Sequence, residues 1–146
     1  MATPELDAPP RHRTDLVVVP VLRLDLLRLQ ALSYATSLAA PVLAVHVSTD
    51  PHDAKEFRRH WEAWGAHVPL EIIQSPYRAT LAPLARYLQD LHAQRPDLTL
   101  NLVLPELVPA SVLQRPLHNG LARRLTRLMR SKPWVTVTPV PFKMPA

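Results

Sequence analysis

Five short apolar runs alternate with segments of helical spacing, and this alternation restricts the fold more than any other feature of the sequence. The runs cover residues 16–19, 42–47, 68–74, 98–104 and 134–138. In each segment between them, apolar residues recur every three or four positions, as on one face of a helix. Strands that are joined by single helices pair in parallel through right-handed crossovers. The sequence therefore predicts an α/β fold, a three-layer doubly wound sandwich around a five-stranded parallel sheet.

The four intervening segments are predicted to be amphipathic helices. Their apolar stripes consist of Leu24, Leu27, Ala31, Ala35 and Leu38; Ala54, Phe57, Trp61 and Trp64; Leu81, Leu84, Leu88 and Leu91; and Leu113, Leu117, Leu121, Leu125 and Leu128. The second helix has the clearest boundaries, because Asp50 is suited to the N-cap, Pro51 to the first turn and Gly65 to a left-handed stop. Pro83 moves the expected start of the third helix to near Thr80.

Composition and charge limit the function classes. Residues 1–13 are polar and contain prolines, so they are predicted to be a flexible tail or linker before one domain at residues 14–143. No apolar stretch approaches the roughly 20 residues that span a bilayer, and the N-terminus has no signal-peptide core. Without cysteine, disulfides, thiolate metal sites and cysteine nucleophiles are excluded. These features favour a cytoplasmic location.

The chain is basic, with 17 Lys and Arg against 12 Asp and Glu and a formal net charge of +5. Most of the basic residues are arginines, whose guanidinium groups bind phosphate oxygens in pairs, so phosphate ligands or an anionic lipid surface are candidate partners. A solvated basic surface is the alternative. Nucleic-acid binding is not expected, because aromatic residues make up only 5% of the chain and do not lie among the arginines.

The loop after the third run is the best candidate for a ligand site. Doubly wound sheets bind ligands beyond the carboxyl ends of their strands, often on a glycine-rich loop, but this chain has only two glycines and neither follows a strand. Ser75 and Pro76 can open a helix whose free N–H groups bind an anion. Arg78 can add a charged fork and Tyr77 a flat face for a purine. The alternative is an ordinary helix start with a packed Tyr77 and a solvated Arg78.

The remaining candidates are weaker. Three arginines recur on one face of the fourth helix: Arg123, Arg127 and Arg130, with Arg124 and Lys132 beside them. These residues can bind acidic protein, lipid headgroups or a nucleotide. Alternatively, they simply complement the helix dipole. The seven histidines lack zinc-site spacing, so no metal site is predicted, and His46 is expected to be a hydrogen-bonded core residue. No Gly-x-Ser-x-Gly elbow occurs, and Glu106 is most simply a salt-bridge partner, so no catalytic residue is predicted.

Several short motifs, taken in order, resemble one known family. They are Asp15-Leu-Val-Val-Val-Pro, Leu43-Ala-Val-His-Val, Gln74-Ser-Pro-Tyr-Arg, Val103-Leu-Pro-Glu, Leu117-His-Asn and Val135-Thr-Val-Thr-Pro-Val-Pro-Phe. Over about residues 14–143 the chain resembles the cytosolic C-terminal domain of APC-superfamily permeases, in particular the bacterial high-affinity potassium importers. That domain is similar to universal stress proteins, which have a five-stranded α/β fold and commonly form dimers.

The resemblance implies regulation rather than catalysis. It implies a homodimer at the cytosolic face of the membrane, next to the membrane-embedded part of a cation or amino-acid transporter, with cyclic di-AMP as a regulatory ligand and no other cofactor. The matching positions for that ligand are Ser75, Pro76, Tyr77 and Arg78, followed by His118 and Asn119. Two alternatives are a dimerisation or docking scaffold without a ligand, and a free-standing stress-type protein that binds ATP.

Two departures from the resembled families bear on these alternatives. ATP-binding universal stress proteins carry glycines after the fourth strand, where this chain has residues 105–109, Pro-Glu-Leu-Val-Pro. Side chains in that loop keep backbone amides away from a triphosphate, which argues against ATP binding and hydrolysis. The transmembrane part is also absent, so the chain is expected to be either an excised fragment or a free-standing relative.

Overall fold

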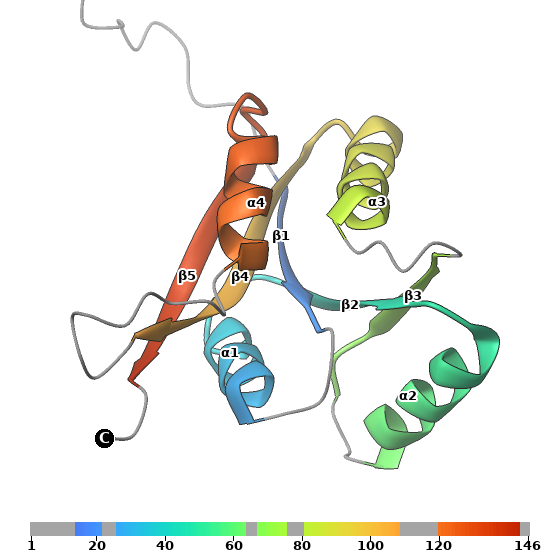
Figure 1. The fold of residues 1–146 in the computed structure, drawn as a ribbon. Coiled ribbons are helices and arrows are strands. Elements are labelled where there is room, and N and C mark those ends of the chain that lie inside the picture. Colours follow the sequence, from blue (N-terminus) through green and yellow to red (C-terminus); the bar gives the residue numbers. More distant parts are fainter. Residues whose placement is uncertain (1–13, 22–25, 64–66, 76–80, 109–119, 144–146) are drawn as a thin grey trace, which may run out of the picture.

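A computed structural model describes residues 14–21, 26–63, 67–75, 81–108 and 120–143 (Figure 1). Strands and helices alternate strictly within this part of the chain. In order, they are β1 (Thr14–Pro20), α1 (Leu26–Thr36), β2 (Val42–Ser48), α2 (Pro51–Ala63), β3 (Leu70–Gln74), α3 (Leu81–Gln94), β4 (Leu98–Val108), α4 (Gly120–Met129) and β5 (Val135–Lys143). No helix in the described ranges combines the length and the apolar character that crossing a bilayer requires.

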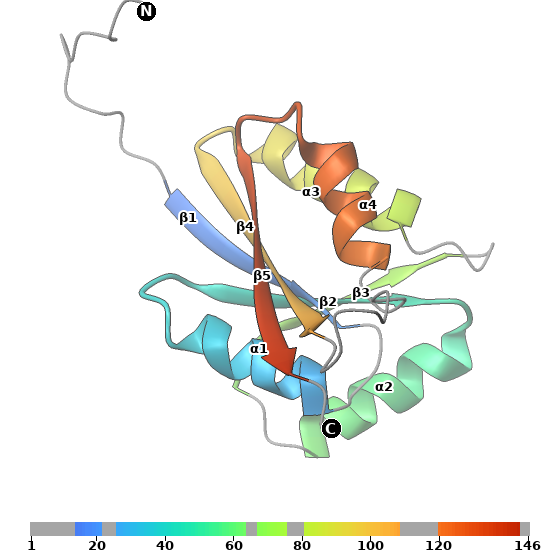
Figure 2. The same ribbon diagram turned by 60° about the vertical axis from the view of Figure 1, so that its left-hand side comes forward.

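The five strands form one parallel sheet with the order β3-β2-β1-β4-β5. The chain first adds strands on one side of β1 and then returns to add β4 and β5 on the other side. Figure 2 shows α1 and α2 on one face of the sheet and α3 and α4 on the opposite face. The predicted three-layer doubly wound sandwich is therefore confirmed.

Each face of the sheet has its own apolar core, because successive side chains of a strand point to opposite faces. On the α3/α4 face, the even-numbered leucines of β4 pack with Leu84, Leu88 and Leu125. On the α1/α2 face, Phe57 and Trp61 of α2 pack with residues of β1 and β2. Burial on both faces explains why the strands read as nearly continuous apolar runs.

The expected N-cap of α2 is confirmed, since the N–H of Asp53 donates to Oδ1 of Asp50 over 2.7 Å. One predicted stripe residue is placed wrongly. Leu128 is 44% exposed, whereas Met129 is 2% exposed and packs beside Leu125. Met129 lies four residues after Leu125, and Leu128 only three, and in α4 the i+4 neighbour faces the sheet. The predicted stop at Gly65 and the start of the fourth helix before residue 120 lie outside the described residues.

Two strands continue well past their predicted ends, and β1 starts at Thr14, two residues before its predicted start. β4 continues to Val108 instead of ending at Leu104, and β5 continues to Lys143 instead of ending at Thr138. β5 passes through Pro139 and Pro141, which the sequence pattern treats as its end. It can do so because β5 is an edge strand, and a proline is tolerated where its nitrogen faces away from the neighbouring strand.

Candidate ligand site at the carboxyl ends of the strands

The sheet divides between β1 and β4 at its carboxyl end. The pairing of these strands starts at Thr14 and Leu98 and stops at Val18 and Leu102, although β4 runs on to Val108. Beyond this point β1 remains paired with β2 and β4 remains paired with β5. Figure 1 shows the ends of β1 and β4 diverging. This is the topological switch point, the place where doubly wound sheets bind their ligands.

Two prolines account for the division. The N–H of Thr14 donates to the carbonyl oxygen of Asp97, so even-numbered residues of β1 and odd-numbered residues of β4 face each other in this ladder. To continue beyond Val18 and Leu102, the β1–β4 ladder would need backbone N–H donors at residues 20 and 105. Both are proline and have no N–H. The carbonyl oxygens of Val103 and Pro20 therefore receive no donor from the neighbouring strand.

Three polar residues are buried in the described part of the chain, and all lie at this same end of the sheet. His46 and Ser48 belong to β2, and Ser75 directly follows β3; each is at most 3% exposed. The hydroxyl of Ser48 donates to the carbonyl oxygen of Asp50 over 2.6 Å. The N–H of Ser75 donates to the carbonyl oxygen of Ser48 over 2.8 Å. These contacts fix the turn that follows β2 and hold the residue after β3 against the end of β2.

His46 connects three elements, as expected for a hydrogen-bonded core histidine. Its Nδ1 lies 2.8 Å from the carbonyl oxygen of Val21, just beyond β1, and its Nε2 lies 3.1 Å from Oδ2 of Asp53 in α2. A carbonyl and an ionised carboxylate only accept hydrogen bonds, so the ring is the donor toward them. The ring also stacks on Phe57, with centroids 3.6 Å apart and an angle of 8° between the planes. His46 thus holds the end of β1 against the start of α2.

The contact between His46 and Asp53 changes the pKa of the Asp53 carboxyl. The hydrogen bond from His46 is the main cause that lowers the pKa of the Asp53 carboxyl, with a smaller contribution from Ser48, and partial burial opposes the shift. The Asp53 side chain is 47% exposed, so solvent weakens the attraction.

The lowered pKa predicts a dependence of stability on pH. A carboxyl whose pKa is lower in the folded than in the unfolded chain stabilises the fold above the unfolded value, about pH 4, and this contribution is lost as pH falls through the folded value. We expect the difference in unfolding free energy between the chain and its Asp53→Asn variant to shrink as pH falls from about 6 to about 3. Urea denaturation at a series of pH values measures this difference. A constant difference would contradict the role of the carboxylate.

One of the predicted ligand-binding residues lies in the described part of the site. Ser75 is buried at the carboxyl end of the sheet, and its backbone nitrogen lies 2.8 Å from the carbonyl oxygen of Ser48. Tyr77, Arg78, His118 and Asn119 lie outside the described residues, so their proposed contacts stay predictions. Among the described residues, no three His, Asp or Glu side chains come together in a way that could hold a metal ion.

The sequence reasoning missed the two features that shape this end of the sheet. The sequence pattern predicts that Pro20 ends a strand and that Pro105 belongs to a loop, and it does not show that the two residues face each other. His46 was expected to find hydrogen-bond partners, but Asp53 was assigned only to the first turn of the helix. The available signal was their spacing. His46 lies near the end of a strand, and Asp53 follows seven residues later in the first turn of the next helix.

A parallel five-stranded sheet of this order, with its switch point between β1 and β4, defines a universal-stress-protein-like α/β domain. A crystal structure of a protein of the universal stress protein family from Burkholderia pseudomallei has this fold, with a TM-score of 0.55 and 16% sequence identity, over 92% of this chain and all of that one. The more specific assignment comes from the sequence: residues 11–142 match the family described as the KimA potassium transporter C-terminal domain, and the chain belongs to that family.

A full-length relative points the same way. The chain is 27% identical over 136 residues to the potassium transporter KimA of Bacillus subtilis (strain 168). The match covers 92% of this chain but only 22% of that protein. The chain therefore corresponds to about a fifth of the length of this curated relative.

Proposed function

We propose that this chain is the regulatory, non-catalytic cytosolic domain of a KimA-type potassium transporter. It acts as a homodimer at the cytosolic face of the membrane, beside the membrane-embedded part of the transporter, and binds cyclic di-AMP at the carboxyl ends of its strands. The observation that carries the proposal is the family match over residues 11–142, which assigns the chain to a domain that accompanies a transporter.

The geometry of the strand ends supports a ligand without a triphosphate. The division between β1 and β4 opens the sheet at the switch point, and Pro20 and Pro105 leave carbonyl oxygens there without donors from the neighbouring strand. Such acceptors suit the amino group of a purine base. Pro20 and Pro105 themselves offer no backbone N–H to a phosphate chain, and Arg78 is the residue proposed to bind phosphate.

A two-fold dimer fits a ligand that is itself symmetric. Each protomer would present one base site and one arginine to one half of the cyclic dinucleotide. Binding across the two protomers would also stabilise the dimer by mass action.

Titration of the purified chain with cyclic di-AMP tests the proposal. We expect heat of binding in calorimetry and a rise in melting temperature, and we expect the Arg78→Ala variant to bind at least about tenfold more weakly, because a charge-assisted contact to phosphate is removed. ATP and AMP serve as comparison ligands, and light scattering with and without ligand reports the dimer.

Absence of both heat and a melting shift at high micromolar cyclic di-AMP would remove the ligand from the proposal. A dimer that ignores every nucleotide would then favour the second candidate, a docking scaffold. The observation in favour of that candidate is the exposure of four arginines of the α4 region, Arg123, Arg124, Arg127 and Arg130.

A further inference from the structure

The two edges of the sheet differ in their capacity to accept another strand. The N–H of Leu100 in β4 donates to the carbonyl oxygen of Trp134, just before β5. Even-numbered residues of β5 therefore direct their backbone groups to β4, and odd-numbered residues direct theirs to the free edge. Pro139 and Pro141 therefore remove two outward donors from this edge. Prolines at such positions hinder pairing with another chain.

The β3 edge carries no such protection. The N–H of Ser75 donates to Ser48, and the carbonyl oxygen of Pro69 accepts from Ala44, so odd-numbered residues face β2. Leu70, Ile72 and Gln74 then direct their backbone groups to the free edge, and none of them is proline. β3 is the last strand of the sheet on this side and has no further neighbour among the described strands.

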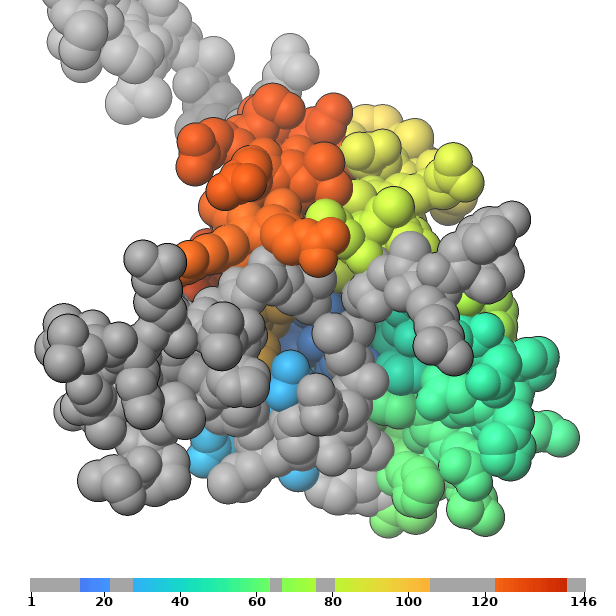
Figure 3. Space-filling view, in the orientation of Figure 1, coloured from blue at the N-terminus to red at the C-terminus, as the bar shows by residue number. Residues whose placement is uncertain are grey.

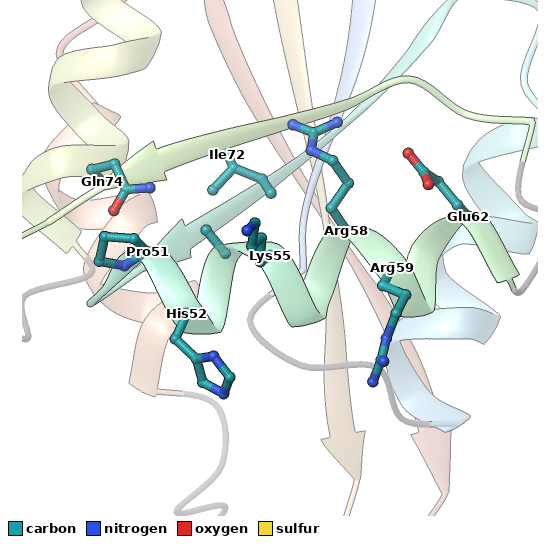
Figure 4. Close-up of a pocket in the computed structure, with 9 residues that line it drawn as sticks. Pro51, His52, Lys55, Arg58, Arg59, Glu62, Ile72 and Gln74 are labelled. Carbon is teal, nitrogen blue, oxygen red and sulfur yellow. The ribbon is translucent and has the colours of Figure 1, made fainter.

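A basic groove runs beside this open edge. Its volume is about 750 Å³, and its lining residues from α2 and β3 are Pro51, His52, Ala54, Lys55, Arg58, Arg59, Glu62, Ile72 and Gln74. Figure 4 shows Arg58 pointing from α2 toward β3 and Arg59 pointing away from the strand, while Lys55 lies on α2 between Pro51 and Arg58. Figure 3 shows α2 on the flank of the molecule, away from α4.

The cations of the groove are available to a partner. Lys55 and Arg58 are exposed and form no ion pair with another residue in the described ranges. Glu62 is the one acid in the lining, against Lys55, Arg58 and Arg59. A row of free backbone donors and acceptors beside unpaired cations is complementary to an extended chain that carries acidic side chains.

We propose that the β3 edge and the α2 groove form a docking site for an extended acidic peptide segment of a partner protein. The segment adds to the sheet beside β3 through main-chain hydrogen bonds with Leu70, Ile72 and Gln74. Its acidic side chains on the α2 side pair with Lys55 and Arg58. This surface lies at the edge of the sheet and does not depend on a ligand at the β1/β4 division.

The groove fits a peptide better than a membrane surface. Arg58 leans over the strand instead of pointing away from it, and Glu62 would be repelled by anionic headgroups. The backbone groups of β3 also offer hydrogen bonds that a lipid surface does not match in spacing. Phosphatidylserine vesicles therefore serve as the competing probe in the test.

Fluorescence polarisation with a labelled peptide of alternating Glu and Val tests the site. We expect Arg58→Glu to weaken binding about tenfold or more, because one attractive contact becomes repulsive. Arg86→Glu is the matched control, since it makes the same charge change at an exposed position of α3, on the opposite face of the sheet from the groove. We expect it to change binding less than about twofold.

Two further probes separate main-chain pairing from charge alone. N-methylation of alternate amides of the peptide should abolish binding, and Gln74→Pro should weaken it about tenfold because it removes an outward N–H from an exposed position. Circular dichroism checks that both variants and Gln74→Pro are folded. Equal effects of Arg58→Glu and Arg86→Glu, undiminished binding of the methylated peptide, or binding to the vesicles but not to the peptide would each overturn the proposal.

Discussion

Replacement of His46 by alanine is expected to lower the free energy of unfolding by about 2–4 kcal/mol. The substitution leaves the buried carbonyl of Val21 without its partner 2.8 Å away, removes the hydrogen bond to Asp53, and opens a void against the ring of Phe57. Urea denaturation monitored by tryptophan fluorescence measures the loss.

His60→Ala is the control for this variant, because His60 is an exposed histidine of α2, the helix that contributes Asp53 and Phe57. We expect it to change stability by less than about 0.5 kcal/mol. If His46→Ala costs no more than His60→Ala, the link between the end of β1 and α2 is not a structural support. A selective rise in proteolysis of residues near Val21 in His46→Ala would locate the damage at the strand ends.

Replacement of Trp61 by alanine is expected to have the largest effect, a loss of about 3–5 kcal/mol. The Trp61 side chain is 4% exposed, packs 6.2 Å from Phe57 between ring centroids, and its Nε1 donates to the carbonyl of Val68 over 3.0 Å. It therefore anchors the end of α2 to the segment that leads into β3.

Trp61→Phe separates packing from hydrogen bonding. The smaller ring retains most of the apolar contact but cannot donate to Val68, so we expect a loss of about 1–2 kcal/mol. Thermal and urea unfolding of both variants provide the comparison. A loss with Trp61→Phe as large as with Trp61→Ala would mean that the hydrogen bond, and not the packing, holds α2 in place.

The fold could be predicted because its signals are local. Apolar runs mark strands that are buried on both faces, and Asp50 with Pro51 marks the start of α2, so neither requires knowledge of distant partners. The assignment of Leu128 to the core was wrong because a leucine three residues after Leu125 and a methionine four residues after it are equivalent in a pattern. Packing against the sheet decides between them.

The candidate site was predictable only in its position. Ser75 could be assigned to the carboxyl end of the sheet because it directly follows the third apolar run of the sequence. The division between β1 and β4 could not be predicted, because it depends on the register that brings Pro20 and Pro105 onto facing edges, and register is a property of the folded sheet. The lengths of β4 and β5 depend on the same property. β4 continues past Pro105 because it stays paired with β5 on its other side, and β5 continues past Pro139 and Pro141 because their nitrogens face away from β4.

The unequal edges have a consequence for self-association. A molecule with two open parallel edges can add copies head to tail, with β5 of one copy beside β3 of the next, and such a non-closing arrangement grows into fibres. Pro139 and Pro141 interrupt the hydrogen bonds that this growth would need on one side of each copy. Chain-to-chain polymerisation is therefore arrested at β5, even while β3 remains open to other proteins.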